Sequence, residues 1–200
     1  MNFCVRRIAV PAAVLIALTG SAFAHTGHGD TSGFVHGFMH PLGGLDHVLV
    51  MAAVGVYAAM IGGRALWLMP LTFVGMMALG GAMGASGIVD PFVEVGIAMS
   101  VIVLGLAVAL RVNLPTITAI ALIGLFAIFH GHAHGAEMPQ DVSGYTYAAG
   151  FMLATVLVHG AGIGLGLLAG RLAARGGWRV AQAAGGAMAL AGVAILMGVH

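Results

Sequence analysis

The sequence contains no lysine and only one cysteine, and charged residues make up only 6% of its 200 residues. With a formal net charge of +1, the chain lacks the basic surface by which proteins bind nucleic acids. Cys4 lies near the N-terminus, before the first apolar stretch. The chain therefore cannot form an internal disulfide bond, and beyond Cys4 it offers no thiolate to a metal ion.

Apolar residues are abundant instead. They make up 60% of the sequence beside 33 glycines, and the mean hydropathy is +1.07. A soluble domain does not need this much apolar surface, whereas several membrane-spanning helices of about 20 residues each do. We expect an all-α integral membrane protein, a bundle of six transmembrane helices that follows a cleaved signal peptide. The predicted spans are 45–62, 65–84, 91–110, 114–133, 145–168 and 179–198.

The N-terminal segment has the pattern of a secretory signal peptide. Arg6 and Arg7 precede the apolar run 8–18, and Ala22-Phe23-Ala24 is a small-residue cleavage pattern. We predict a signal peptide at residues 1–24 and one six-span transmembrane domain at residues 25–200. An uncleaved anchor helix is the alternative, which the shortness of the apolar run disfavours.

The charges beyond residue 24 agree with a single orientation in the membrane. If the mature N-terminus is outside, every arginine falls inside and every carboxylate falls on the outer half, as the positive-inside rule requires. The arginines are Arg64, Arg111, Arg171, Arg175 and Arg179, and the carboxylates are Asp30, Asp46, Asp90, Glu94, Glu137 and Asp141. Six spans then place both ends of the mature chain outside.

One nine-residue segment places three histidines and a carboxylate at the end of an apolar run. It reads Phe129-His130-Gly131-His132-Ala133-His134-Gly135-Ala136-Glu137. On a helix, His130, His134 and Glu137 share one face, whereas His132 points away from it. Nitrogen and oxygen ligands one turn apart suit a divalent transition ion, although a proton relay or a polar loop could use the same residues.

A second polar cluster opens the first predicted span. His36, His40 and His47 share one helical stripe if the helix continues through Pro41 and the glycine pair that follows it. Asp46 and His47 lie inside the apolar stretch, where a charged side chain costs about 2.5–3.5 kcal/mol and by default marks a functional site. A buried hydrogen-bonded pair that stabilises the bundle is the structural alternative.

Two further polar residues lie at membrane depth. Glu94 lies one turn into the third predicted span, and His159 lies near the middle of the fifth. Polar groups on four of six helices could converge on one interior, which is typical of an ion pathway. His25 and His28, at the start of the predicted mature chain, form a candidate entrance site, with a polar tail as the alternative.

On these residues the chain resembles the HupE/UreJ family of nickel permeases associated with hydrogenase and urease. That family has an H-x5-D-H motif in its first mature span and an F-H-G-x-A-H-G-x-E motif in its fourth. This sequence matches both motifs at every position. His40, Asp46 and His47 match the first motif, and residues 129–137 match the second. The surroundings of Glu94 and His159 resemble further family segments. The resemblance implies a six-span transporter of nickel, or of cobalt, in the bacterial inner membrane.

We therefore expect a secondary transporter, not an enzyme, that carries Ni(II) or Co(II) from periplasm to cytoplasm and supplies nickel for hydrogenase or urease maturation. The metal is the substrate, and no permanently bound cofactor is expected. The expected metal ligands are His40, Asp46, His47, His130, His134 and Glu137. The residues expected to line the path or to support those ligands are His36, Glu94, His132 and His159.

The same residues also fit other functional hypotheses. An intramembrane zinc-dependent hydrolase could use the same histidines and carboxylates, with one coordination position left for water. A metal sensor or a structural subunit is a further alternative. Besides the metal ion and the lipid bilayer, a second copy of the chain is a candidate partner. Glycines four residues apart, such as Gly162, Gly166 and Gly170, can serve internal and oligomer contacts alike.

Overall fold

The protein is described by a computed structural model that covers residues 33–138 and 144–198, and these residues form helices and short connections without a strand. The all-α prediction is therefore confirmed for this part of the chain. The predicted signal peptide, residues 1–24, lies outside the described residues, as do His25, His28, Asp30 and Asp141.

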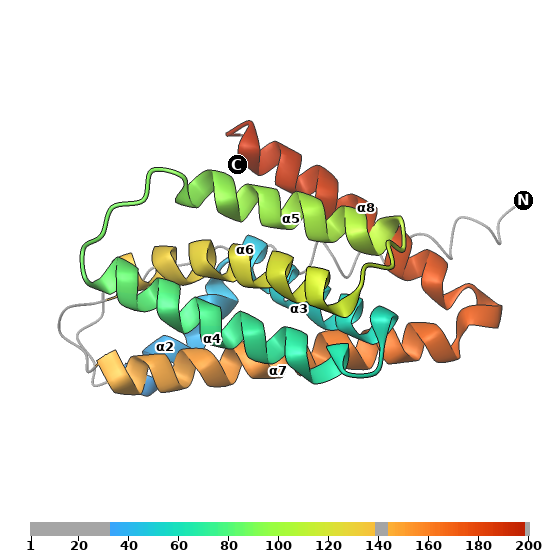
Figure 1. Cartoon of the computed structure of the whole chain (residues 1–200), viewed down its shortest axis with the longest axis horizontal. Coiled ribbons are helices and arrows are strands. Elements are labelled where there is room, and N and C mark those ends of the chain that lie inside the picture. The colour runs from blue at the N-terminus through green and yellow to red at the C-terminus, as the bar shows by residue number, and fades with distance from the viewer. Residues whose placement is uncertain (1–32, 139–143, 199–200) are drawn as a thin grey trace, which may run out of the picture. The chain divides into compact units, whose positions relative to one another are not determined.

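Six of the helices coincide, within a few residues at each end, with the six predicted spans (Figure 1). They are α3 (Leu45–Ile61), α4 (Ala65–Ala85), α5 (Val93–Ala109), α6 (Thr116–Ala136), α7 (Gly144–Arg171) and α8 (Gly177–Leu196). Two elements are additional: α2 (Gly33–Gly43) precedes α3, and the short 3-10 helix η1 (Ala173–Arg175) connects α7 to α8.

The lengths and apolar composition of these helices fit a multi-pass membrane protein. Within the described residues, α4, α6, α7 and α8 are each long and apolar enough to cross a membrane. The pair α2 and α3 passes the same test as one broken span, bent by 83°. Helix α5 is apolar but has only 17 residues. Four to five spans are therefore supported by length and composition, and the count of six stays a prediction.

The bend between α2 and α3 decides whether the helix continues through Pro41 and the two glycines. A continuous helical stripe of His36, His40 and His47 does not exist, because the helix is interrupted at Gly44, whose backbone is extended with φ −98° and ψ 118°. Pro41 remains inside α2 and is buried. Interrupted helices at membrane depth leave free backbone groups that need partners, so they are tolerated where they line a cavity or are buried in protein.

Glycines hold α4 and α6 side by side at very short distance (Figure 1). A Cβ atom built on Gly80 or Gly84 of α4 would overlap a backbone carbonyl oxygen of α6. Likewise, a Cβ atom on Gly131 or Gly135 of α6 would overlap a carbonyl oxygen of α4. Small residues are what allow helices to associate in lipid, where apolar surface alone does not drive them together.

Two other helix pairs use the same device. Helix α3 packs along α7, with Gly55 and Gly162 at the contact, and α5 packs along α8, with Gly105 and Gly185 there. The contacting residues advance together in α3 and α7 and in α4 and α6, so these pairs are parallel. In α5 and α8 they run in opposite order, so this pair is antiparallel.

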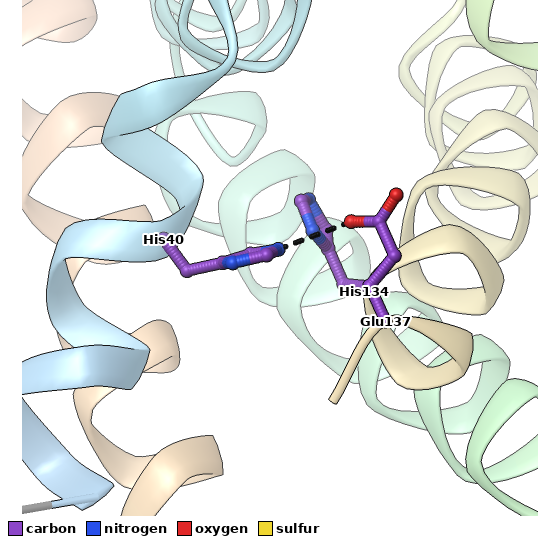
Figure 2. A group of neighbouring side chains, drawn as sticks. All are labelled: His40, His134 and Glu137. Atoms are coloured by element: carbon purple, nitrogen blue, oxygen red, sulfur yellow. Dashed lines mark ion pairs between the residues drawn. The ribbon is translucent and has the colours of Figure 1, made fainter. Parts of the chain in front are cut away.

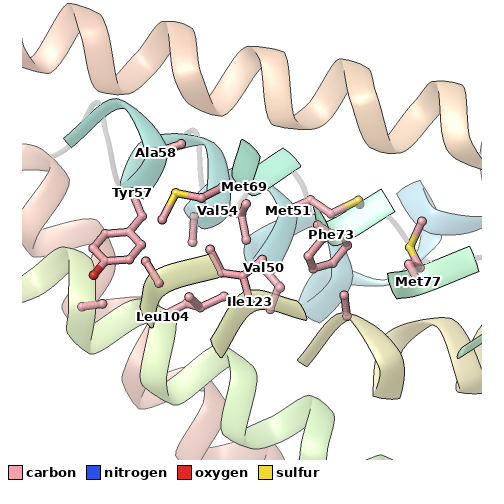
Figure 3. Close-up of a cluster of buried hydrophobic side chains, with 14 of the residues drawn as sticks. Val50, Met51, Val54, Tyr57, Ala58, Met69, Phe73, Met77, Leu104 and Ile123 are labelled. Atoms are coloured by element: carbon pink, nitrogen blue, oxygen red, sulfur yellow. The ribbon is translucent and has the colours of Figure 1, made fainter. Parts of the chain in front are cut away.

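A buried apolar cluster lies between these pairs (Figure 3). Its largest fully buried side chains include Tyr57 of α3, Phe73 of α4, Leu104 of α5 and Ile123 of α6. Since all six of the main helices contribute, this cluster fixes how the helix pairs pack on one another, and Phe73 also borders the polar residues described below.

The glycine contacts generate a prediction about stability. Gly131→Ala should lower the free energy of unfolding by about 1–3 kcal/mol, because the added methyl group forces α4 and α6 apart. Gly75→Ala is the matched control on α4, since nothing lies within 4 Å of a Cβ built there. The free energy of unfolding of the two purified variants is measured in the same detergent and compared with that of the parent. Equal stability of both would show that the α4–α6 backbone contact is not required.

Candidate metal site

The centre of the site is a group of three side chains from α2 and the end of α6. One ligand atom from each of His40, His134 and Glu137 lies within 4.8 Å of the other two. His40 Nε2 is 3.3 Å from Glu137 Oε2 as an ion pair (Figure 2). His134 is buried, and its Nδ1 has no hydrogen-bond partner in the described part of the chain. An unpartnered buried nitrogen is costly unless something else binds it.

The cluster continues inward from His134 through two more imidazoles. The ring of His47, from the start of α3, lies 4.1 Å from the ring of His134 and 4.8 Å from that of His130, measured between centroids. Asp46 Oδ1 lies 2.9 Å from His47 Nδ1. The structure thus brings the six expected ligands into one continuous cluster at the junction of α2, α3 and α6.

Ser100 of α5 is a member of this site that the sequence analysis missed. Its Oγ lies 2.7 Å from His130 Nε2, and its hydroxyl donates to the Ile97 carbonyl at 2.6 Å. A hydroxyl has one proton, so His130 Nε2–H must donate to Ser100 Oγ. The lone-pair nitrogen of His130 is then Nδ1. A lone serine in an apolar span gave no sequence signal of this role.

His159 lies deeper, beyond an aromatic side chain. The Phe73 ring lies 6.0 Å from the His130 ring and 5.0 Å from the His159 ring, between centroids. His159 Nδ1 donates to the Thr155 carbonyl at 2.7 Å, which leaves Nε2 as the lone-pair nitrogen. That nitrogen is buried without a hydrogen-bond partner in the described residues. Phe73 therefore separates His159 from the other imidazoles.

The remaining residues of segment 129–137 pack α6 against its neighbours. A Cβ atom on Gly96 of α5 would overlap the ring of Phe129, and Gly131 and Gly135 face α4 as described. His132 points away from the cluster. Its Nε2–H donates a hydrogen bond, at 2.6 Å, to the carbonyl of Ile88, which lies in the connection between α4 and α5. His132 therefore has a structural partner of its own.

Two other residues expected on the path lie at the edge. His36 is exposed on α2, with its ring 6.4 Å from that of Tyr147. Tyr147 in turn lies 5.8 Å from His40, so His36 borders the outer end of the cluster. Glu94 is exposed in the first turn of α5, and the structure does not bring it to the imidazoles.

This arrangement has the chemistry of a divalent-metal site. Imidazole nitrogens and carboxylate oxygens are ligands for first-row transition ions, and two carboxylates match the two charges of such an ion. Glu137 is 64% exposed and His40 is 24% exposed. The outer ligands can therefore close on an arriving ion, whereas His130 and His134 are held by packing.

The fold and the site together define a class, a multi-pass helical membrane protein with a histidine and carboxylate cluster. The family model described as HupE / UreJ protein matches residues 13–195. Protein HupE of Rhizobium leguminosarum bv. viciae is 48% identical over 184 residues, which cover 92% of this chain and 94% of that protein. No solved structure matches the chain.

The chain therefore belongs to the HupE/UreJ family. This confirms the resemblance drawn from the two motifs. Members of this family are accessory membrane proteins of hydrogenase and urease systems, which is consistent with metal transport, and the family is not one of known enzymes.

The contact between Ser100 and His130 generates the second prediction. Ser100→Ala should lower the free energy of unfolding by about 1–3 kcal/mol, because it leaves the buried Nε2–H of His130 without an acceptor. Ser86→Ala is the control, since Ser86 is exposed and bonds only the Met83 carbonyl three residues away; it should change stability by less than about 0.5 kcal/mol.

The tautomer of His130 gives a second readout. Nitrogen-15 spectra of histidine-labelled protein should show His130 with its proton on Nε2 in the parent chain. A proton on Nδ1 would contradict the hydrogen-bond assignment, whatever the stability of the variant.

Proposed function

We propose that this protein is a secondary transporter that carries Ni(II), or the chemically similar Co(II), from the periplasm into the cytoplasm for hydrogenase or urease maturation. The cargo is bound by His40, Asp46, His47, His130, His134 and Glu137. The observation that carries the proposal is the grouping of His40, His134 and Glu137, whose ligand atoms lie within 4.8 Å of one another.

The imidazoles form a series that leads from the surface to the interior. The side chains of His40 and His47 are 24% and 12% exposed, whereas His134 is 7% exposed and His130 and His159 are each 1% exposed. Each ring from His40 to His130 has the next within 5 Å, which allows an ion to exchange ligands one at a time. Binding that is shared over several weak sites lets an ion enter and also leave.

Helix directions and charges support six spans in the expected orientation. If the chain crosses the membrane at α3 to α8 in turn, α3 and α7 must be parallel, α4 and α6 parallel, and α5 and α8 antiparallel, and the glycine contacts have these directions. In this topology the arginines all lie at the inner ends and the carboxylates at the outer ends. The signal peptide at 1–24 and the inner-membrane location belong to the same proposal.

The membrane potential can drive the entry of the ion. A charge that crosses 100 mV gains about 2.3 kcal/mol, so a divalent cation gains about twice this. Asp46 and Glu137 lie at the outer side of the proposed path, where they offset the charge of the ion as it loses water. Because the chain binds through nitrogen and oxygen alone, its affinity stays compatible with release.

Two buried histidines on the same helix provide the test. His134→Gln should weaken nickel binding by the purified protein at least about tenfold, since even residues that only support a ligand are worth 10–100-fold in affinity. It should also abolish nickel uptake by cells that produce the variant. Equilibrium dialysis and uptake of radioactive nickel measure the two effects.

His132→Gln is the matched control. His132 is 6% exposed against 7% for His134, and glutamine can still donate to the Ile88 carbonyl. This variant should bind and accumulate nickel like the parent. If His134→Gln accumulates nickel equally well at the same membrane abundance, the proposed function fails.

A further inference from the structure

A polar cavity lies apart from the imidazoles, where α5 ends and α8 begins. It has a volume of about 510 Å³ and is lined by Arg111, Arg175, Arg179, Trp178 and Gln182 together with small residues of η1. None of the carboxylates in the described residues lines it. We call it the arginine pocket. The positive-inside rule accounts for arginines on this side of the membrane, but it does not require three of them to line one cavity.

Arg111 is held in the pocket by an unusual backbone conformation. Its φ is +51°, and it is the one residue other than glycine with positive φ in the described chain. Arg111 N–H donates to the Val108 carbonyl and Val112 N–H to the Ala107 carbonyl, at 3.2 and 2.9 Å. These two bonds form a Schellman motif, in which this position is usually glycine. An arginine here costs backbone strain, which is a mark of functional positions.

Contacts between α5 and α8 fix the walls of the pocket. The guanidinium carbon of Arg111 lies 4.9 Å from the centre of the Trp178 ring, in a cation–π contact. Gln182 donates from Nε2 to the Ala109 carbonyl at 2.9 Å. The pocket is therefore built before any ligand arrives, with one cation stacked on an aromatic ring and two more arginines lining the same cavity.

We propose that the arginine pocket binds a phosphate group. Guanidinium groups bind phosphate through paired, charge-assisted hydrogen bonds, and three of them without a competing carboxylate favour an anion with more than one oxygen. The phosphate can belong to an anionic phospholipid or to a free phosphate compound. Leu110 and Val180 beside the pocket are 69% and 71% exposed, which suits the headgroup of a lipid whose chains cover them.

Arg111→Gly is the most direct test variant. Glycine fits the left-handed backbone better than arginine does, so the variant should unfold at a temperature no lower than the parent. It should nevertheless bind phosphate at least about tenfold more weakly, because a hydrogen-bonded charge is lost. Arg179→Gln, in the first turn of α8, should have a similar effect. Arg64→Gln removes the same charge from an exposed residue between α3 and α4 and is the control.

Two arms of the experiment separate the sources of phosphate. Native mass spectrometry of the purified full chain counts bound phosphatidylglycerol against phosphatidylcholine, and inorganic phosphate is titrated as the competitor. Preferential binding of phosphatidylglycerol that Arg111→Gly loses and Arg64→Gln keeps supports a lipid site. Displacement by millimolar phosphate supports a site for a free anion. If Arg111→Gly matches the parent in both arms, the proposal is overturned.

Discussion

The backbone contact between α4 and α6 is the constraint on which the rest of the site depends. In lipid, apolar side chains gain little by leaving their surroundings, so helices associate through close packing. Gly80 and Gly84 of α4 and Gly131 and Gly135 of α6 all lie at this contact, and a Cβ atom at any of them would overlap a carbonyl oxygen of the opposite helix. Gly131 and Gly135 of the nine-residue segment thus fix the rotation of α6 against α4. This rotation sets the directions in which the histidines of the segment point.

The same segment shows how packing and chemistry alternate along one helix. Two glycines face α4, His132 bonds the loop after α4, and His130 and His134 turn towards α2 and α3. Ser100 fixes the ring of His130, and the broken helix at Gly44 brings both His40 and His47 to His134. The proposed transport function follows from this convergence, because an ion can pass between imidazoles that packing already holds in place.

Much of this could be predicted from the sequence, for physical reasons. Apolar runs of span length predicted the six main helices, and helical spacing separated His132 from His130 and His134. The sequence left open whether the helix continues through residues 41–44 or is interrupted there, because proline and glycine in a membrane helix are compatible with both. Ser100 gave no signal, because one hydroxyl in an apolar span usually bonds its own helix. Glu94 was expected to lie near the imidazoles, but it lies exposed in the first turn of α5 and has no described contact with them.

The central claim is that the chain by itself moves nickel through the imidazole cluster. The most direct measurement is the entry of radioactive nickel into proteoliposomes that contain only the purified full-length protein. We predict nickel entry that saturates with nickel concentration and accelerates when the interior is made electrically negative. Folded, correctly inserted protein that leaves nickel outside under both conditions would contradict it.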